Sequence, residues 1–537
     1  MKKFLTDTFL LITSAILFAF SQPNMLVLEG LPFLAYFALF PMFIVVRNVR
    51  FRVVWLYGIL YGALSYGFLV YWLIDFHPVI GLPIIVGLYG FQYMILFLVL
   101  KVGFTVCGKF GWIVQWIIWC AYEYIKTTGF AGFSYGNTAY SHWQMLPLIQ
   151  IVDLVGIWGL CALITFPSAW LSVVIPTVLK NKQEWKIVLK REFFAHKISA
   201  FIWIGLFVFS LTYGLIVQKD YSTYEQKKIA LIQANTDPWQ GGTVAYTRDY
   251  AILERLTNEA LAENPDVDMV VWSETAFIPS IKMHYKFREN RLRFDLVKEL
   301  LTFIESKNVP FVIGNPNTVR NYTDNTHYEV EDYNAVYLFK PGENVIPPEP
   351  YIYNKMHLVP FTESFPYEKQ LPWLYDILME NDTHLWNMGT EASVFTVDNL
   401  TFGTPICFED TFGYVGRRFV NNGAQAFVNV TNDSWAHDPV CQYQHLAMAT
   451  FRSVENRVPT VRATASGQTA VIDPNGKITV MAPNFEETFL IGEVPVVKNA
   501  SKTLFTLWGD WVAYIFIGLS VISLLIGFVQ IVLKKNK

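Results

Sequence analysis

Three side chains with the chemistry of a nucleophilic site follow apolar, strand-like segments in the second half of the chain. Glu274 comes after MVVW, Lys355 lies in YIYNKMHLV, and Cys407 ends TFGTPIC. A free thiol has a pKa of about 8.5, so little of it is thiolate at neutral pH and it needs a base. A carboxylate can take the thiol proton and later return one to a leaving group, and an ammonium can stabilise an oxyanion at an attacked carbonyl. These residue types could therefore carry out acyl chemistry.

Each of these residues also has a purely structural interpretation. A carboxylate or a lysine near a strand end is commonly solvated, and a cysteine in an apolar strand commonly packs in the core. Cys441 could also pair with Cys407 in an oxidising compartment. The chain has five cysteines and lacks the CxxC or Cys/His spacing typical of zinc sites. We therefore expect no disulfide framework and no metal.

The composition indicates the class of protein that carries these residues. Of 537 residues, 53% are hydrophobic and 16% are charged, whereas a soluble domain has about 25% charged residues. The mean hydropathy is +0.31. A net charge of -3 argues against a nucleic-acid binder, which would need a basic face. These values exclude an ordinary cytosolic enzyme and predict a membrane protein.

The apolar residues gather in eight runs, each long enough to cross about 30 Å of hydrocarbon as a helix. Short β-branched strands alternate with polar helical stretches between the seventh and eighth runs, which is typical of an α/β domain. We therefore expect seven transmembrane helices in 1–217, a catalytic domain in 218–507, and a last helix with a basic tail in 508–537. The start of the chain also resembles a signal peptide, but we expect an uncleaved first helix. The runs lie near residues 6–21, 28–46, 54–74, 79–100, 110–127, 150–179, 198–217 and 511–533.

Positive charges predict the orientation in the membrane. With eight helices, every basic connection falls on one side, while the connections near 22–27, 75–78 and 128–149 contain no Lys or Arg. The positive-inside rule makes the basic side cytoplasmic. Both termini are then cytoplasmic, and the α/β domain lies outside the cytoplasm. The basic residues are Lys2, Lys3, Arg47, Arg50, Arg52, Lys101, Lys109, Lys180, Lys182, Lys186, Lys190, Arg191, Lys197, Lys534, Lys535 and Lys537.

The order of the three chemical residues resembles a known family. Glu274, Lys355 and Cys407 are similar in order and separation to the Glu-Lys-Cys triad of the nitrilase superfamily, whose fold is an αββα sandwich. The segment NVTNDSW (429–435) is similar to the turn that follows the nucleophile in those enzymes. With its eight expected helices and the polar loop at 129–143, nearly the whole chain resembles the apolipoprotein N-acyltransferases, a membrane-embedded branch of that superfamily.

The resemblance also implies supporting residues. Glu363, in VPFTESFPY, is similar to a glutamate that assists the triad, and Trp239 and Glu409 fall where the family has functional residues. Phe408 departs from the pattern, because the family commonly has tyrosine beside the nucleophile. Any role for a hydroxyl at this position is therefore in doubt, but the triad is not.

The resemblance implies a two-step reaction at a bacterial cytoplasmic (inner) membrane, on its periplasmic side. Cys407 would take an acyl chain from a glycerophospholipid as a thioester, and the N-terminal amine of a diacylglyceryl-modified apolipoprotein would then accept it. The implied partners are these two substrates and membrane lipid, with no nucleic acid. No cofactor is implied, because the acyl ester already carries the energy.

Two other interpretations use the same sequence. A membrane-tethered amidase of the nitrilase superfamily would use the same triad with water as the second nucleophile, although eight helices exceed what a tether needs. A transporter or receptor would place charged residues inside the bundle as a substrate path. The few acidic residues near the expected helices lie close to helix ends, which argues against transport; they are Asp75, Glu123 and Asp153.

Overall fold

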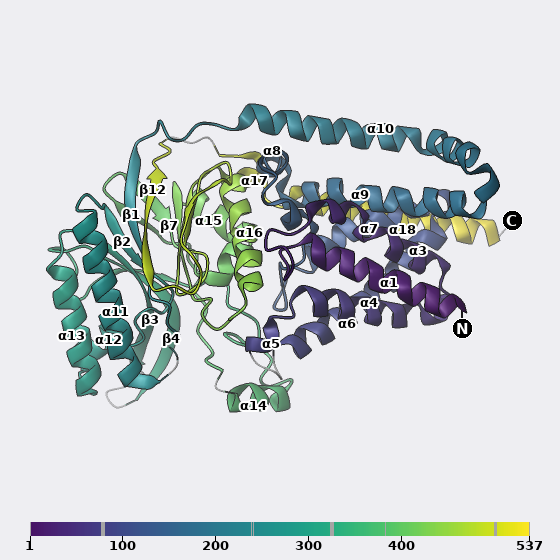
Figure 1. The fold of residues 1–537 in the computed structure, drawn as a ribbon. Coiled ribbons are helices and arrows are strands. Elements are labelled where there is room, and N and C mark those ends of the chain that lie inside the picture. Colours follow the sequence, from purple (N-terminus) through teal and green to yellow (C-terminus); the bar gives the residue numbers. More distant parts are fainter. Residues whose placement is uncertain are drawn as a thin grey trace. The chain divides into compact units, whose positions relative to one another are not determined.

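The computed structural model describes residues 2–76, 81–237, 239, 241–322, 327–381, 383–498 and 502–535. The chain divides into two compact units, one formed by residues 1–218 and 507–537 and the other by 219–506 (Figure 1). The start of the expected run near 79–100 and the end of the basic tail lie outside the described residues.

The first unit is helical, and its main helices coincide with the apolar runs. Among the described residues, five helices are long and apolar enough to cross a membrane, namely α1, α6, α9, α10 and α18. The runs near 28–46, 54–74 and 110–127 form shorter helices. The helices are α1 (Lys2–Ser21), α2 (Ala35–Ala38), α3 (Phe40–Asn48), α4 (Val54–Leu69), α5 (Leu73–Phe76), α6 (Leu82–Val106), α7 (Gly111–Ile125), α8 (Leu146–Ile149), α9 (Val152–Lys180), α10 (Trp185–Val217) and α18 (Trp511–Lys535).

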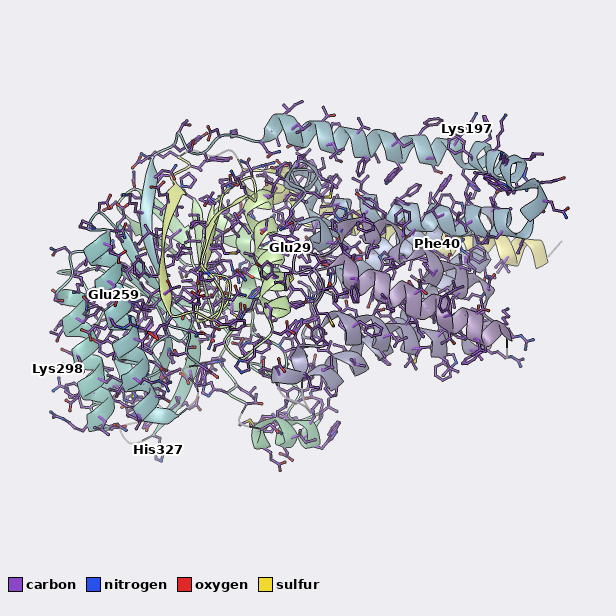
Figure 2. The ribbon with its side chains drawn as sticks, in the orientation of Figure 1. Glu29, Phe40, Lys197, Glu259, Lys298 and His327 are labelled. Atoms are coloured by element: carbon purple, nitrogen blue, oxygen red, sulfur yellow. The ribbon has the colours of Figure 1, made fainter. Side chains whose placement is uncertain are left out.

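One boundary differs from the sequence-based expectation. The sequence predicts that the basic stretch before residue 198 connects two helices, but α10 begins at Trp185 and includes Lys186, Lys190, Arg191 and Lys197. Lysine and arginine favour helices, and a polar helical segment can extend beyond the hydrocarbon. Figure 2 shows Lys197 on this part of α10, and its side chain is exposed.

A buried ion pair holds the polar loop that follows α7. Glu123 and Lys126 are fully buried and lie 3.1 Å apart. The carboxylate accepts hydrogen bonds from Trp119 Nε1 at 3.0 Å and Thr138 Oγ1 at 2.5 Å, and Lys126 Nζ donates to the Gly136 carbonyl at 2.8 Å. Buried charges at membrane depth need such partners. The pair therefore fixes the loop at 129–143 to the end of α7.

Within the described residues, the second unit contains two six-stranded sheets. Their strand orders are β12-β1-β2-β3-β4-β5 and β11-β10-β9-β8-β7-β6, and in both sheets central parallel strands are flanked by antiparallel ones. The strands are β1 (Gln226–Gln233), β2 (Met269–Trp272), β3 (Phe311–Tyr322), β4 (Tyr328–Phe339), β5 (Tyr351–Asn354), β6 (Val394–Val397), β7 (Leu400–Gly403), β8 (Ala426–Thr431), β9 (Thr460–Thr464), β10 (Ala470–Ile472), β11 (Ile478–Met481) and β12 (Thr488–Pro495).

Helices cover the outer face of each sheet. Helices α11, α12 and α13 lie beside β1–β4, while α15 and α16 lie beside the second sheet (Figure 1). Charged residues such as Glu259 of α11 and Lys298 of α13 are exposed (Figure 2). The helices of this unit are α11 (Gly242–Glu263), α12 (Ile281–Phe287), α13 (Arg291–Glu305), α14 (Pro372–Glu380), α15 (Gly413–Asn421) and α16 (Pro439–Asn456); α17 (Leu504–Trp508) crosses the boundary between the units.

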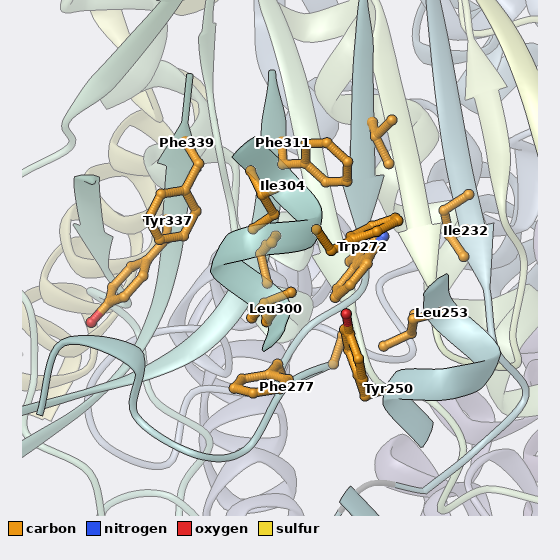
Figure 3. Packing of buried hydrophobic residues seen from close by; sticks show 14 of the residues in the cluster. Ile232, Tyr250, Leu253, Trp272, Phe277, Leu300, Ile304, Phe311, Tyr337 and Phe339 are labelled. Atoms are coloured by element: carbon orange, nitrogen blue, oxygen red, sulfur yellow. The ribbon is translucent and has the colours of Figure 1, made fainter. Parts of the chain in front are cut away.

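The apolar strands of the first sheet are buried on both faces. Side chains on one face pack against α11 and α13, as Figure 3 shows. Successive residues of a strand point to opposite faces, and the alternate residues Ile229, Leu231 and Val271 are also fully buried. Strands buried on both faces need continuous apolar runs, which is why these segments read as VVW and IALI. The labelled side chains in Figure 3 belong to the core between the sheet and these helices; they are Ile232, Tyr250, Leu253, Trp272, Phe277, Leu300, Ile304, Phe311, Tyr337 and Phe339.

We expect Gly314→Ala to destabilise the second unit, because β3 passes very close to the turn that carries Glu274. A Cβ at Gly314 would lie 2.3 Å from the Ser273 carbonyl oxygen and 2.6 Å from the Glu274 Cα. Overpacking of this kind costs about 1–3 kcal/mol, which a lower melting temperature of the purified protein would reveal. Gly87→Ala in α6 is the control, since its added Cβ meets nothing within 4 Å. Equal melting temperatures for the two variants would contradict the prediction.

Candidate active site

A buried ammonium joins two of the predicted carboxylates. Lys355 directly follows β5 and its side chain is fully buried. Its Nζ lies 3.2 Å from Glu274 Oε1 and 2.8 Å from Glu363 Oε1. Burial alone would lower the pKa of Lys355, but the two carboxylates raise it above its ordinary value. The ammonium therefore stays charged, and it holds both carboxylates in place.

Two further donors orient Glu274: Asn334, which the sequence analysis did not identify, and Asn432, which lies in the segment NVTNDSW named there. Asn334 Nδ2 donates to Glu274 Oε1 at 2.7 Å and to Glu363 Oε1 at 3.3 Å. The backbone N–H of Asn432 donates to Glu274 Oε2 at 2.8 Å. Both Glu274 oxygens thus accept hydrogen bonds from fixed donors. The sequence feature that could have identified Asn334 is its place as a polar amide residue at the start of the otherwise apolar segment NAVYLF.

Cys407 begins a short 3-10 helix, Cys407–Thr411, shortly after β7. Its φ is +48°, a left-handed conformation that non-glycine residues rarely adopt. Burial raises the pKa of the thiol well above its ordinary value, the Glu274 charge raises it further, and Lys355 acts in the opposite direction. The resting sulfur is therefore a thiol, and a nearby base is needed to activate it. All five cysteines lie among the described residues and none forms a disulfide, so no disulfide joins Cys407 to Cys441.

Glu409 connects the cysteine segment to the lysine segment. It is fully buried, and Oε2 accepts a hydrogen bond from the Ile406 N–H at 2.8 Å. Oε1 accepts from the N–H groups of Met356 at 2.7 Å and His357 at 3.0 Å, and the Tyr353 hydroxyl donates to both oxygens. Burial raises the pKa of Glu409 to about 7, although these donors act against the shift. In this geometry Glu409 fixes the spacing between the two segments.

Phe408 and Trp239 lie in aromatic clusters. Phe408 is buried, with its ring centroid 4.9 Å from that of Phe412 and 5.7 Å from that of His357. Trp239 is 44% exposed, and its ring centroid lies 5.8 Å from that of Trp386. The backbone N–H of Trp386 donates to the backbone carbonyl of Glu363 at 2.8 Å. Trp239 is therefore placed beside the segment that carries Glu363.

The site offers groups for nucleophilic chemistry. Within the described part of the chain, no group of three or more His, Cys, Asp or Glu side chains is arranged to hold a metal ion. The geometry instead provides a thiol, a hydrogen-bonded carboxylate and a buried ammonium, which is the set needed for attack on a carbonyl carbon.

Comparisons with known proteins identify the family of the chain. The family model described as "Carbon-nitrogen hydrolase" matches residues 228–501, and that described as "Apolipoprotein N-acyltransferase N-terminal domain" matches residues 14–170. The chain is 43% identical to Apolipoprotein N-acyltransferase 1 of Treponema denticola over 95% of its own length and 94% of that protein. It is 42% identical to Apolipoprotein N-acyltransferase 1 of Treponema pallidum over 98% of its own length and 96% of that protein.

One solved structure similar to this chain is that of Saccharomyces cerevisiae Nit3, a member of branch 10 of the nitrilase superfamily. The identity is 19%, the match covers 50% of this chain and 90% of that one, and the TM-score is 0.35. The family matches confirm the predicted resemblance and the predicted fold class, a helical membrane region with a nitrilase-like α/β domain. The chain belongs to the apolipoprotein N-acyltransferase family, and its α/β unit is a carbon-nitrogen hydrolase domain.

Proposed function

We propose that the protein transfers an acyl chain from a glycerophospholipid to the N-terminal amine of a diacylglyceryl-modified apolipoprotein, through a thioester on Cys407. The observation that carries this proposal is the contact of the buried Lys355 ammonium with the carboxylates of Glu274 and Glu363. The charges of all three also act on the Cys407 thiol. Family membership supports the choice of substrates.

In the first half of the reaction, Glu274 takes the proton from Cys407 Sγ and the sulfur attacks the ester carbonyl carbon. Lys355 Nζ and the Phe408 backbone N–H stabilise the oxyanion. When the intermediate collapses, the ester C–O bond breaks and Glu274 returns the proton to the leaving glycerol oxygen. The products are lysophospholipid and the thioester.

In the second half, the free amine of the acceptor attacks the thioester carbonyl. Glu274 takes the amine proton, the C–S bond breaks, and the proton returns to the sulfur. The amide formed is more stable than the ester consumed, so transfer proceeds forward. No cofactor enters either half.

The supporting residues have proposed roles that follow from their contacts. Glu363 orients Lys355, and Glu409 holds the Cys407 segment at a fixed distance from it. Phe408 supplies a backbone N–H and an apolar wall. Trp239 presents an exposed aromatic face to substrate beside the Glu363 segment.

The helical regions hold substrates with lipid tails. We assign 1–217 and 508–537 to the membrane and 218–507 to catalysis. Each CH₂ group in the bilayer holds a lipid there by about 0.8 kcal/mol, so a soluble enzyme would have to extract its substrates. The proposed location is a bacterial cytoplasmic (inner) membrane, with the α/β domain on the periplasmic side and both termini in the cytoplasm.

We expect an impermeant thiol reagent to report this orientation in intact cells. In a background with the five native cysteines replaced by alanine, Lys298→Cys on α13 should be labelled once the outer envelope is opened. Lys186→Cys on α10 should be labelled only after the cytoplasmic membrane is permeabilised. Both side chains are exposed. The reverse pattern would place the α/β domain in the cytosol and refute the proposed function.

Exposure of the purified protein to phospholipid should produce an acyl adduct on Cys407. The intact mass should rise by one acyl group, peptide mapping should place it on Cys407, and Cys407→Ala should abolish it. Cys441→Ala, a change at the other cysteine of the same unit, is the matched control and should keep the adduct.

The same experiment separates transfer from hydrolysis. An acyltransferase holds the thioester until an acceptor amine is added, whereas an amidase-like hydrolase releases free fatty acid. Rapid release of fatty acid without acceptor would favour the hydrolase, and an adduct that survives Cys407→Ala would remove the proposed nucleophile.

The surface around α14 is the proposed lipid contact of the α/β domain. Trp373 is 61% exposed on this short helix, next to Leu374. Charged replacements of both should lower turnover of phospholipid more than turnover of a short-chain soluble ester. The matched control replaces Val244 and Leu292, which are 83% and 69% exposed on α11 and α13. Equal losses on both substrates would refute the lipid contact.

A further inference from the structure

We propose that His445 is a positioning residue for the acyl transfer, and that it acts by holding the peptide bond between Cys407 and Phe408. This inference rests on the proposed function. His445 lies on α16 and is 2% exposed. Its Nε2 lies 3.3 Å from the Cys407 carbonyl oxygen and 2.7 Å from Asp410 Oδ1, and its Nδ1 lies 3.3 Å from Asp433 Oδ1.

The partners of the ring identify its protonation state. Both nitrogens face oxygens, and carboxylate and carbonyl oxygens accept hydrogen bonds. Both nitrogens must therefore carry protons, which makes the ring an imidazolium. Burial alone would lower the pKa of His445, but Asp410 and Asp433 raise it to about 9.

The surrounding charges balance this buried cation. Arg462 is fully buried, is paired with Asp410, and places Nη2 3.9 Å from Asp433 Oδ2. Nearby, Arg452 pairs with Glu455 at 2.9 Å. The cluster thus contains three buried cations and three buried carboxylates. The cations are His445, Arg462 and Arg452, and the carboxylates are Asp410, Asp433 and Glu455. A charge left alone in such an interior would be costly, so the cluster keeps His445 in one position and one charge state.

The contact with the Cys407 carbonyl controls the direction of a catalytic donor. A peptide bond is planar and trans, so the carbonyl of Cys407 and the N–H of Phe408 point in opposite directions. Holding the carbonyl with His445 therefore sets the direction of the N–H that faces the oxyanion in the proposed mechanism. It also stabilises the left-handed backbone of Cys407, whose φ is +48°.

The neighbouring peptide groups are held by other side chains. Glu409 accepts from the Ile406 N–H at 2.8 Å, and Thr411 Oγ1 donates to the Phe408 carbonyl at 2.8 Å. His445 supplies the middle hydrogen bond of this series. It contacts the main chain of the nucleophile rather than its sulfur, so its effect is on geometry.

Two isosteric replacements separate this role from a general effect on stability. The amide nitrogen of glutamine can occupy the position of His445 Nε2, and that of asparagine can occupy the position of Nδ1. Both variants lose the same positive charge. Only His445→Gln keeps a donor directed at the Cys407 carbonyl.

The experiment measures the rate of thioester formation on Cys407 from phospholipid as a function of phospholipid concentration. His445→Asn should lower the maximal rate by about 10²-fold, the effect expected when a catalytic group is misplaced by about 1 Å. The half-saturating phospholipid concentration should not change. His445→Gln should retain most of the maximal rate, although its melting temperature should fall about as far as that of His445→Asn. The control is His284, another buried histidine of the same unit. His284→Asn and His284→Gln should have the same maximal rate as each other.

The outcomes distinguish this inference from the proposed function. Equal rates for His445→Asn and His445→Gln, or losses that follow the melting temperature, would overturn the role of His445. Absence of any thioester in the unmodified protein would overturn the proposed function instead. If the single variants unfold, each is combined with Asp433→Asn, which removes one buried negative charge and restores the balance.

A measurement on the unmodified protein gives an independent check. With ¹⁵N-labelled histidine, one of the nine histidines should still show both ring nitrogens protonated at about pH 8, where an ordinary histidine is neutral. A spectrum in which every ring is neutral at that pH would overturn the imidazolium assignment and, with it, the inference.

Discussion

The structure of the site depends on keeping the ammonium of Lys355 charged although it is shielded from water. Lys355 is fully buried, and an unpaired charge in that position would strongly favour unfolding. Its two carboxylate partners come from different places in the chain, Glu274 after β2 and Glu363 in the segment after β5. Bringing them together requires that β2 and β5 belong to the same sheet with the observed strand order. The fold of the sheet therefore fixes the charges that act on the Cys407 thiol.

The second sheet positions Cys407, the proposed nucleophile, through backbone geometry. Cys407 has an unfavourable left-handed conformation, and such strain persists only where surrounding contacts hold it. Glu409 ties its segment to the lysine segment, and His445 of the charged cluster contacts the Cys407 carbonyl. The first sheet thus fixes the charged groups of the site, and the second sheet holds the strained backbone of Cys407.

Much of this arrangement could be anticipated from the sequence. Apolar runs indicated the membrane helices, and strand-like segments preceded Glu274, Lys355 and Cys407, which enter the proposed mechanism. Asn334 and His445 were not anticipated, because their partners lie 60 and 38 residues away and only tertiary packing brings them together. The start of α10 was placed too late, since hydropathy marks the membrane-embedded part of a helix and not its polar extension.

The segment that carries Glu363 and α14 is closed at its base by main-chain hydrogen bonds. The Gly389 N–H donates to the Lys355 carbonyl at 2.7 Å, and the Trp386 N–H donates to the Glu363 carbonyl at 2.8 Å. The distal part, which includes α14, is therefore attached to the scaffold without taking part in its sheets. Because lengthening a loop of this kind adds only a small entropic cost, related enzymes can vary the length and apolar character of this part while the chemical groups stay unchanged. Substrate range and catalysis can consequently evolve at separate rates within one domain.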